Sequence, residues 1–205
     1  MPVPLEVCVD SVASARAAKR GGASRLEVCD SLVEGGTSPS VGLVRTIAQC
    51  GIGLPMHVMV RPRGGDFLYT QDEIDVMCAD IRVLREIGAS GIVLGVLDQD
   101  GKVDEPRLRH LVRLAAPLPV TFHRAIDVSA SPCEAVRACL RCGVARVLTS
   151  GGAPSAEEGL QTLQQMVSIA AGRMILAAGG GVNEHNCERI ARMSGVDEST
   201  YQRPG

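Results

Sequence analysis

The chain has 205 residues, and its 21 lysines and arginines nearly balance its 23 aspartates and glutamates, which leaves a net charge of −2. The charges are scattered without a basic run, so the sequence lacks the electrostatic footprint of a nucleic-acid-binding protein. The first twenty residues show no secretory signal, and no apolar stretch approaches the roughly 18 residues of a membrane span. We therefore expect a protein of the cytoplasm, and also of the nucleus, without nucleic-acid or membrane partners.

Short apolar runs rich in β-branched residues recur along the chain and predict seven strands. Aromatic residues are scarce, with two Phe, two Tyr and no Trp, so the core must consist mainly of aliphatic side chains. Such a core suits parallel strands that are buried on both faces. The predicted strands are Leu5–Asp10, Arg25–Asp30, Met56–Arg61, Gly91–Leu97, Val120–Arg124, Arg146–Ser150 and Met174–Ala178.

Signals for helix starts and helix ends lie between the predicted strands. Three pairs have the spacing of a capping box, namely Thr70 with Glu73, Ser131 with Glu134, and Ser155 with Glu158. A proline follows directly after Ser38 and after Ser131, where it suits the first helical position. Most predicted helices end at a glycine, which can adopt the left-handed conformation of a helix end. These glycines are Gly22, Gly88, Gly143, Gly172 and Gly195.

Strict alternation of strands and helices predicts an α/β fold with one parallel sheet, either closed as a TIM-type (β/α)₈ barrel or open and doubly wound. The sequence shows no linker, so we expect a single domain over residues 1–198. Gly195–Glu198 begins an eighth strand in the right place, but polar residues follow it. We therefore expect the eighth strand of a barrel to be truncated or replaced, with residues 199–205 forming a divergent C-terminal tail.

The first two predicted strands contain the same tetrapeptide, Leu-Glu-Val-Cys, at residues 5–8 and 26–29. Because successive side chains of a strand point to opposite faces, Glu6 and Cys8 share one face, as do Glu27 and Cys29. If the strands are neighbours in matching register, carboxylate lies beside carboxylate and thiol beside thiol. The two thiols then form a candidate metal site, although buried cysteines also serve as small apolar core residues.

A second group of residues favours an enzyme, because the reacting groups of α/β barrels stand at the C-terminal ends of the strands. Carboxylates close to arginines inside a barrel have pKa values that are pushed apart, which suits acid–base chemistry. The alternative is that the inward glutamates and Arg61 only neutralise each other, as buried charges must. The candidate catalytic residues are Glu6, Glu27, Arg61, His123 and Asp127.

Seven motifs in sequence order resemble the CutC family of copper homeostasis proteins, over about residues 5 to 198. The most specific of them contains Arg-Pro-Arg-Gly-Gly-Asp-Phe, residues 61–67. The resemblance implies a TIM-type barrel, a cytosolic homo-oligomer, and a role in binding and handling monovalent copper. Family members continue through a full eighth strand, from which this sequence departs after Glu198. The motifs are residues 5–11, 25–29, 34–40, 58–69, 120–127, 147–152 and 179–182.

With this resemblance, Cys8 and Cys29 become candidate Cu(I) ligands, because Cu(I) prefers soft thiolates and neighbouring strands lie only about 4.8 Å apart. The first interpretation is a cytosolic protein that binds Cu(I) through these thiolates for storage or delivery. The second is a TIM-barrel enzyme that acts on a small anionic or phosphorylated metabolite in the Glu/Arg/His pocket. We assign no ligand role to the helical pair Cys139 and Cys142 or to Met59 and the other methionines, which we expect in the core.

Overall fold

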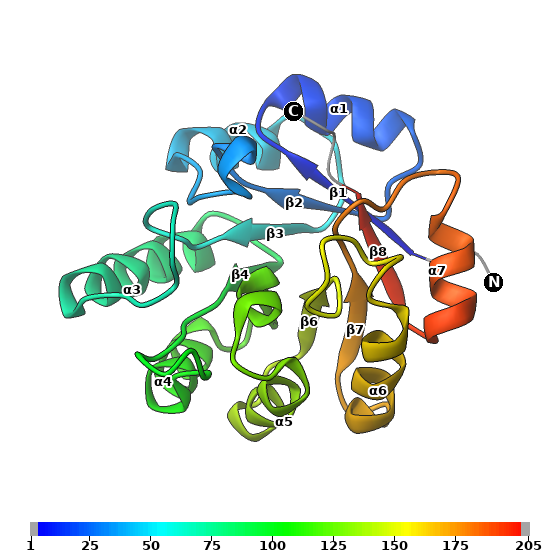
Figure 1. Cartoon of the computed structure of the whole chain (residues 1–205). Coiled ribbons are helices and arrows are strands. Elements are labelled where there is room, and N and C mark those ends of the chain that lie inside the picture. The colour runs from blue at the N-terminus through cyan, green and yellow to red at the C-terminus, as the bar shows by residue number, and fades with distance from the viewer. Residues whose placement is uncertain (1–3, 202–205) are drawn as a thin grey trace.

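The seven predicted strands all form, and each begins within one residue of its predicted start. The computed structural model describes residues 4–201, in which eight parallel strands are hydrogen-bonded in sequence order around a closed barrel. Figure 1 shows the helices outside this ring of strands. The strands are β1 (Leu5–Val9), β2 (Arg25–Val28), β3 (Met56–Met59), β4 (Gly91–Leu94), β5 (Val120–Phe122), β6 (Arg146–Thr149), β7 (Ile175–Ala178) and β8 (Glu198–Tyr201). The helices are α1 (Val12–Arg20), α2 (Val41–Gln49), α3 (Gln71–Glu86), α4 (Glu105–Ala115), α5 (Pro132–Cys142), α6 (Leu160–Ala170) and α7 (Cys187–Ser194), with short 3₁₀ helices at Leu32–Glu34 and Arg124–Val128.

The barrel closes through β8, which pairs with β1 on one side and with β7 on the other (Figure 1). The expectation of a truncated or replaced eighth strand is therefore wrong, and the open doubly wound alternative is excluded. β8 is polar because Glu198 and Thr200 point into a charged lumen, where Thr200 hydrogen-bonds to Glu6. Residues 199–201 thus belong to the barrel, while the rest of the predicted tail, residues 202–205, lies outside the described residues.

The predicted capping signals are confirmed at two helices and displaced at two others. The Thr70–Glu73 capping box starts α3, and Ser131 caps α5 with Pro132 in its first turn. α2 begins two residues later than the Ser38 signal predicts, because Ser40 accepts the capping hydrogen bond. The third capping-box signal forms only a turn ahead of α6.

The sheet separates two regions of buried side chains. The outward faces of the strands and the apolar faces of the helices form the main hydrophobic core, in which Leu26 and Phe122 are fully buried. The lumen holds charged side chains near the starts of the strands and a second, smaller apolar cluster toward their C-terminal ends. Of the helices between residues 4 and 201, none combines the length and the apolarity that crossing a membrane requires. The small lumen cluster consists of Cys8, Cys29, Met59 and Val93.

Two glycines on the β4 side of the lumen make room for imidazole rings. A Cβ atom on Gly91 would lie 2.6 Å from ring atoms of His57, and a Cβ atom on Gly95, directly after β4, would lie 2.5 Å from ring atoms of His123. Real Cβ atoms do not approach heavy atoms this closely. The missing side chains therefore allow two histidines to be buried inside the barrel.

Candidate functional site

An ion-pair network of two glutamates and two arginines fills the N-terminal half of the lumen. Arg146 donates from Nη2 to Oε1 of Glu6 at 3.0 Å and from Nε to Oε2 of Glu198 at 2.8 Å. Arg25 also contacts both carboxylates, with Nε 2.5 Å from Oε2 of Glu6. Burial alone would raise the pKa of Glu6, but the charges of Arg146 and Arg25 hold it below its ordinary value. The sequence suggests Arg61 as the partner that neutralises Glu6. In the structure, Arg25 and Arg146 neutralise it instead.

The two Leu-Glu-Val-Cys strands are parallel neighbours, but they do not pair in the expected register. Cys8 lies level with Glu27, and Glu6 lies level with Arg25, so the second copy is displaced by two residues along the strand direction. The strands of a closed barrel are staggered by its shear, which a repeated tetrapeptide does not set. The expectation that thiol lies beside thiol and carboxylate beside carboxylate is therefore wrong.

The offset places Cys8 beside a carboxyl group and Cys29 nearer the C-terminal end of the barrel. Sγ of Cys8 donates to Oε1 of Glu27 at 3.2 Å, whereas Sγ of Cys29 lies 3.9 Å from the carbonyl oxygen of Val9. Both thiols belong to the lumen cluster, with exposed fractions of 8% and 1%. A strand spacing of about 4.8 Å and a rise of about 3.3 Å per residue put their Cα atoms roughly 8 Å apart.

Burial disfavours the charged forms of the ionisable groups in this layer. It raises the pKa values of the Cys8 and Cys29 thiols well above their ordinary value, and the carboxylate of Glu27 adds to this effect. Burial and the charge of Glu6 raise the pKa of Glu27 to about 7. The second oxygen of Glu27, Oε2, has no hydrogen-bond partner among the described residues. Without metal, the layer therefore holds neutral thiols and a carboxyl group that is protonated easily.

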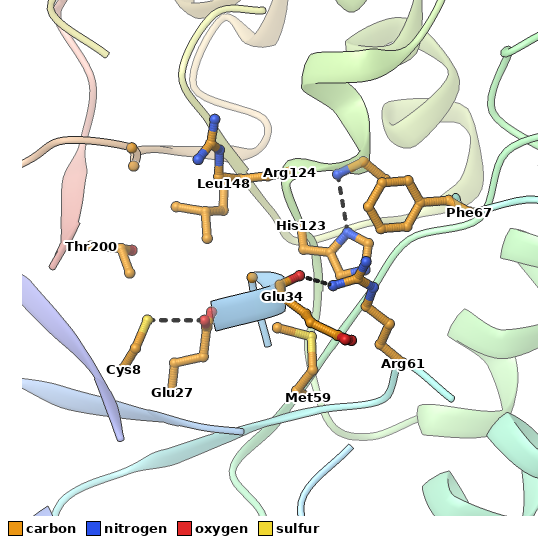
Figure 2. A pocket seen from close by; sticks show the side chains of 14 residues that line it. Cys8, Glu27, Glu34, Met59, Arg61, Phe67, His123, Arg124, Leu148 and Thr200 are labelled. Atoms are coloured by element: carbon orange, nitrogen blue, oxygen red, sulfur yellow. Dashed lines mark hydrogen bonds between the residues drawn. The ribbon is translucent and has the colours of Figure 1, made fainter. Parts of the chain in front are cut away.

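A cavity of about 130 Å³ opens at the C-terminal ends of the strands, next to the thiol of Cys8. Strands on both sides of the barrel contribute to its wall, and Figure 2 shows their side chains pointing toward a shared space. The polar and sulfur-containing residues of this wall include Cys8, Glu27, Met59, Arg61, His123 and Thr200.

His123 contributes a neutral hydrogen-bond donor to the cavity wall. Its Nδ1 accepts the backbone N–H of Ala125 at 3.2 Å, which assigns the proton of the neutral ring to Nε2. Burial and the positive charge of Arg61 lower the pKa of His123 to about 3. The Nε2 atom has no hydrogen-bond partner among residues 4–201. The ring therefore holds a buried N–H group without a partner, in a residue that lines the cavity.

Arg61 is a buried cation that holds two loops together at the barrel mouth. Nη1 donates to the carbonyl oxygen of Glu34 at 2.7 Å (Figure 2) and to that of Gly36 at 3.0 Å, and Nη2 donates to that of Gly65 at 3.0 Å. The guanidinium carbon lies 4.8 Å from the centre of the Phe67 ring. These partners are backbone carbonyls and an aromatic ring, so Arg61 gives the mouth a positive charge.

The five residues predicted for an enzyme do not all come together. Glu27, Arg61 and His123 line one cavity. Glu6 instead lies in the ion-pair network. The carboxylate of Asp127 accepts hydrogen bonds from the loop after β6 and from a neighbouring arginine, and thereby fixes that loop. An acid–base site in this barrel would therefore rest on three of the five residues.

Sequence reasoning missed Met59, which it assigned to the core. In the predicted strand Met56–Arg61, alternation places Met59 on the same face as His57 and Arg61. Two polar residues on that face indicate that it points to the lumen. The structure agrees, since Met59 is 2% exposed, belongs to the lumen cluster and lines the cavity.

The donor chemistry of the lumen suits a soft metal ion. Among residues 4–201, no group of three or more His, Cys, Asp or Glu side chains is placed to hold a metal ion. The lumen cluster does contain two thiols and one thioether. Thiolate and thioether sulfur are the donors that select Cu(I).

Comparisons with known proteins agree with the fold. The sequence model of the CutC family matches residues 3–202. Two relatives named copper homeostasis protein cutC homolog, from Mus musculus and Homo sapiens, are 49% and 48% identical over 194 residues, which cover 95% of this chain and 71% of each relative. The crystal structure of CutC from Streptococcus agalactiae matches with a TM-score of 0.92 at 29% identity, covering 97% of this chain and 98% of that chain. Thiamine phosphate pyrophosphorylase from Pyrococcus furiosus, with a TM-score of 0.66 and 18% identity over 98% of this chain and 85% of that one, shares the fold alone.

Proposed function

Because the chain belongs to the CutC family, we propose that it acts in copper homeostasis and binds Cu(I) through the thiolates of Cys8 and Cys29. The observation that carries this proposal is that both thiols belong to one small lumen cluster, Cys8 on β1 and Cys29 directly after the neighbouring strand β2. All eight cysteines are free, and a reducing cytoplasm would keep them as thiols. The homo-oligomeric state that the resemblance implies remains part of the proposal.

The lumen can tolerate the charge of such a site. Two thiolates and Cu(I) carry a net charge of −1, and a buried charge must be compensated. The guanidinium groups of Arg25 and Arg146 lie nearer the N-terminal ends of the strands than the thiols do. Their positive charges favour the charged form of Glu27. Arg61 contributes a positive charge from the barrel mouth. Since both thiols are protonated in the metal-free protein, copper binding releases protons.

The proposal is tested by anaerobic titration of the reduced protein with Cu(I) against a competing chelator. We expect the wild type to retain a single Cu(I) ion that the Cys8→Ser, Cys29→Ser variant loses. The matched control is Cys139→Ser, Cys142→Ser, which also removes two buried thiols but takes them from α5. Full copper retention by the Cys8→Ser, Cys29→Ser variant would exclude the site.

The cavity also supports a second candidate function, turnover of a small anionic or phosphorylated metabolite. It is favoured by two buried polar atoms without hydrogen-bond partners among the described residues, Nε2 of His123 and Oε2 of Glu27. Both belong to side chains that line the cavity, at the end of the barrel where reacting groups stand. We expect citrate or inorganic phosphate to raise the melting temperature of the metal-free protein and His123→Phe to abolish this shift. The exposed His185 supplies the control variant, His185→Phe. Absence of any shift in the wild type would count against this function.

A further inference from the structure

We propose that Met59 supplies a third sulfur ligand to Cu(I), a neutral thioether beside the two thiolates; this inference rests on the proposed function. The register of β2 and β3 carries the argument. Leu26 pairs with Met56 and Val28 pairs with Val58. Continued one residue past the end of β2, this register places Cys29 level with Met59. Level residues on adjacent strands lie about 4.8 Å apart, much closer than Cys29 lies to Cys8.

The loop residue Gly36 lies against both side chains of this pair. A Cβ atom built on Gly36 would lie 3.2 Å from the methyl carbon of Met59 and 3.6 Å from Sγ of Cys29. Gly36 has a φ of +94°, and its loop therefore closes over this pair of side chains without a side chain of its own. Val93 completes the cluster from β4. The Cys29–Met59 pair is thus enclosed in the lumen and nearly sealed from solvent.

The three sulfur atoms come from β1, from the residue directly after β2, and from β3. Cys8 lies on β1, two residues below the level of Cys29, and Met59 lies beside Cys29 on β3. Cys29 therefore lies between the other two residues. Met59 is beside it at the same height in the barrel, and Cys8 is beside it two residues lower. Met59 and Cys8 also line the same cavity, which leaves space near both side chains (Figure 2).

Charge explains why a thioether suits the third position. Two thiolates already give the copper complex one negative charge, and a third thiolate or a carboxylate would add another in a buried site next to Glu27. A thioether donates an electron pair without adding charge. It is also a soft donor, which Cu(I) prefers to the hard oxygen atoms of Glu27. Met59 therefore completes a three-sulfur site without increasing its charge.

The alternative role of Met59 is simple packing, since methionine often fills irregular gaps in a core. Met59→Leu separates the two roles, because leucine keeps most of the volume and the apolar character but lacks sulfur. Met56→Leu is the matched control: Met56 is also buried, on the same strand, but belongs to the outer core and not to the lumen cluster.

The test combines copper-edge X-ray absorption with Cu(I) competition titrations of the loaded proteins. We expect three sulfur neighbours in the wild type and in Met56→Leu, and two in Met59→Leu, whose affinity falls by about tenfold, or about 1.4 kcal/mol. Two sulfur neighbours in the wild type, with the affinity of Met59→Leu unchanged, would overturn the inference. Failure of the proposed function itself would give a different result, because the Cys8→Ser, Cys29→Ser variant would then retain its copper.

Discussion

Replacing Arg146 by methionine is expected to lower the free energy of unfolding by about 3–5 kcal/mol, the usual cost of breaking a buried ion pair from one side. Arg146 is 2% exposed and donates to both Glu6 and Glu198. The lumen network holds two carboxylates and two guanidinium groups, so removal of one arginine leaves a net negative charge away from water. Arg25 alone must then neutralise both carboxylates.

Chemical denaturation of the metal-free protein at pH 7 measures this effect. Arg141→Met is the control, because Arg141 also pairs with a glutamate, but its side chain is 55% exposed. Exposed ion pairs contribute only about 0–1 kcal/mol. If Arg146→Met is destabilised by no more than Arg141→Met, the network does not hold the barrel together as the contacts indicate.

Acidification is expected to destabilise the protein through two buried histidines. Burial lowers the pKa of His57 to about 4, although its Nδ1 lies 3.9 Å from Glu6, and burial with the charge of Arg61 lowers the pKa of His123 to about 3. In the unfolded chain both take up a proton near pH 6.5. Below pH 6.5 the unfolded state therefore binds more protons, and stability falls by about 1.4 kcal/mol per pH unit for each histidine.

The raised pKa of Glu27 acts in the opposite direction, because the folded protein then binds its proton more readily than the unfolded chain. The informative quantity is therefore a difference between proteins. Between pH 7 and pH 5, we expect His57→Gln and His123→Gln each to lose about 2 kcal/mol less stability than the wild type. The exposed His185 gives the control, His185→Gln, which should follow the wild type. Parallel pH profiles for all four proteins would show that neither ring is buried in its neutral form.

Much of the fold can be predicted from the sequence because its signals are local. Apolar β-branched runs mark seven strands, and glycines such as Gly143 and Gly195 end helices in the left-handed conformation. Apolar runs do not predict β8, because its side chains face a charged lumen. Glu198 and Thr200 become suitable strand residues only when Arg146, which lies about 50 residues away in the sequence, is placed beside them.

The site was predicted less well, because it depends on register. Glu6 and Glu27 occupy the same position in two identical tetrapeptides. Glu6 forms ion pairs with two arginines, whereas Glu27 accepts a hydrogen bond from the thiol of Cys8. The stagger of the closed barrel creates this difference, and it also brings Cys29 level with Met59 instead of Cys8. Alternation along β3 was the only sequence signal that could have placed Met59 in the lumen.

Copper-edge anomalous diffraction from crystals of the Cu(I)-loaded protein would show directly where the ion is bound. We predict one strong peak inside the barrel, about 2.3 Å from Sγ of both Cys8 and Cys29, by comparison with zinc–sulfur bonds. A peak at the partly exposed cysteines outside the lumen, or at the imidazole of His123 with none between the two lumen thiols, would contradict the proposed copper site.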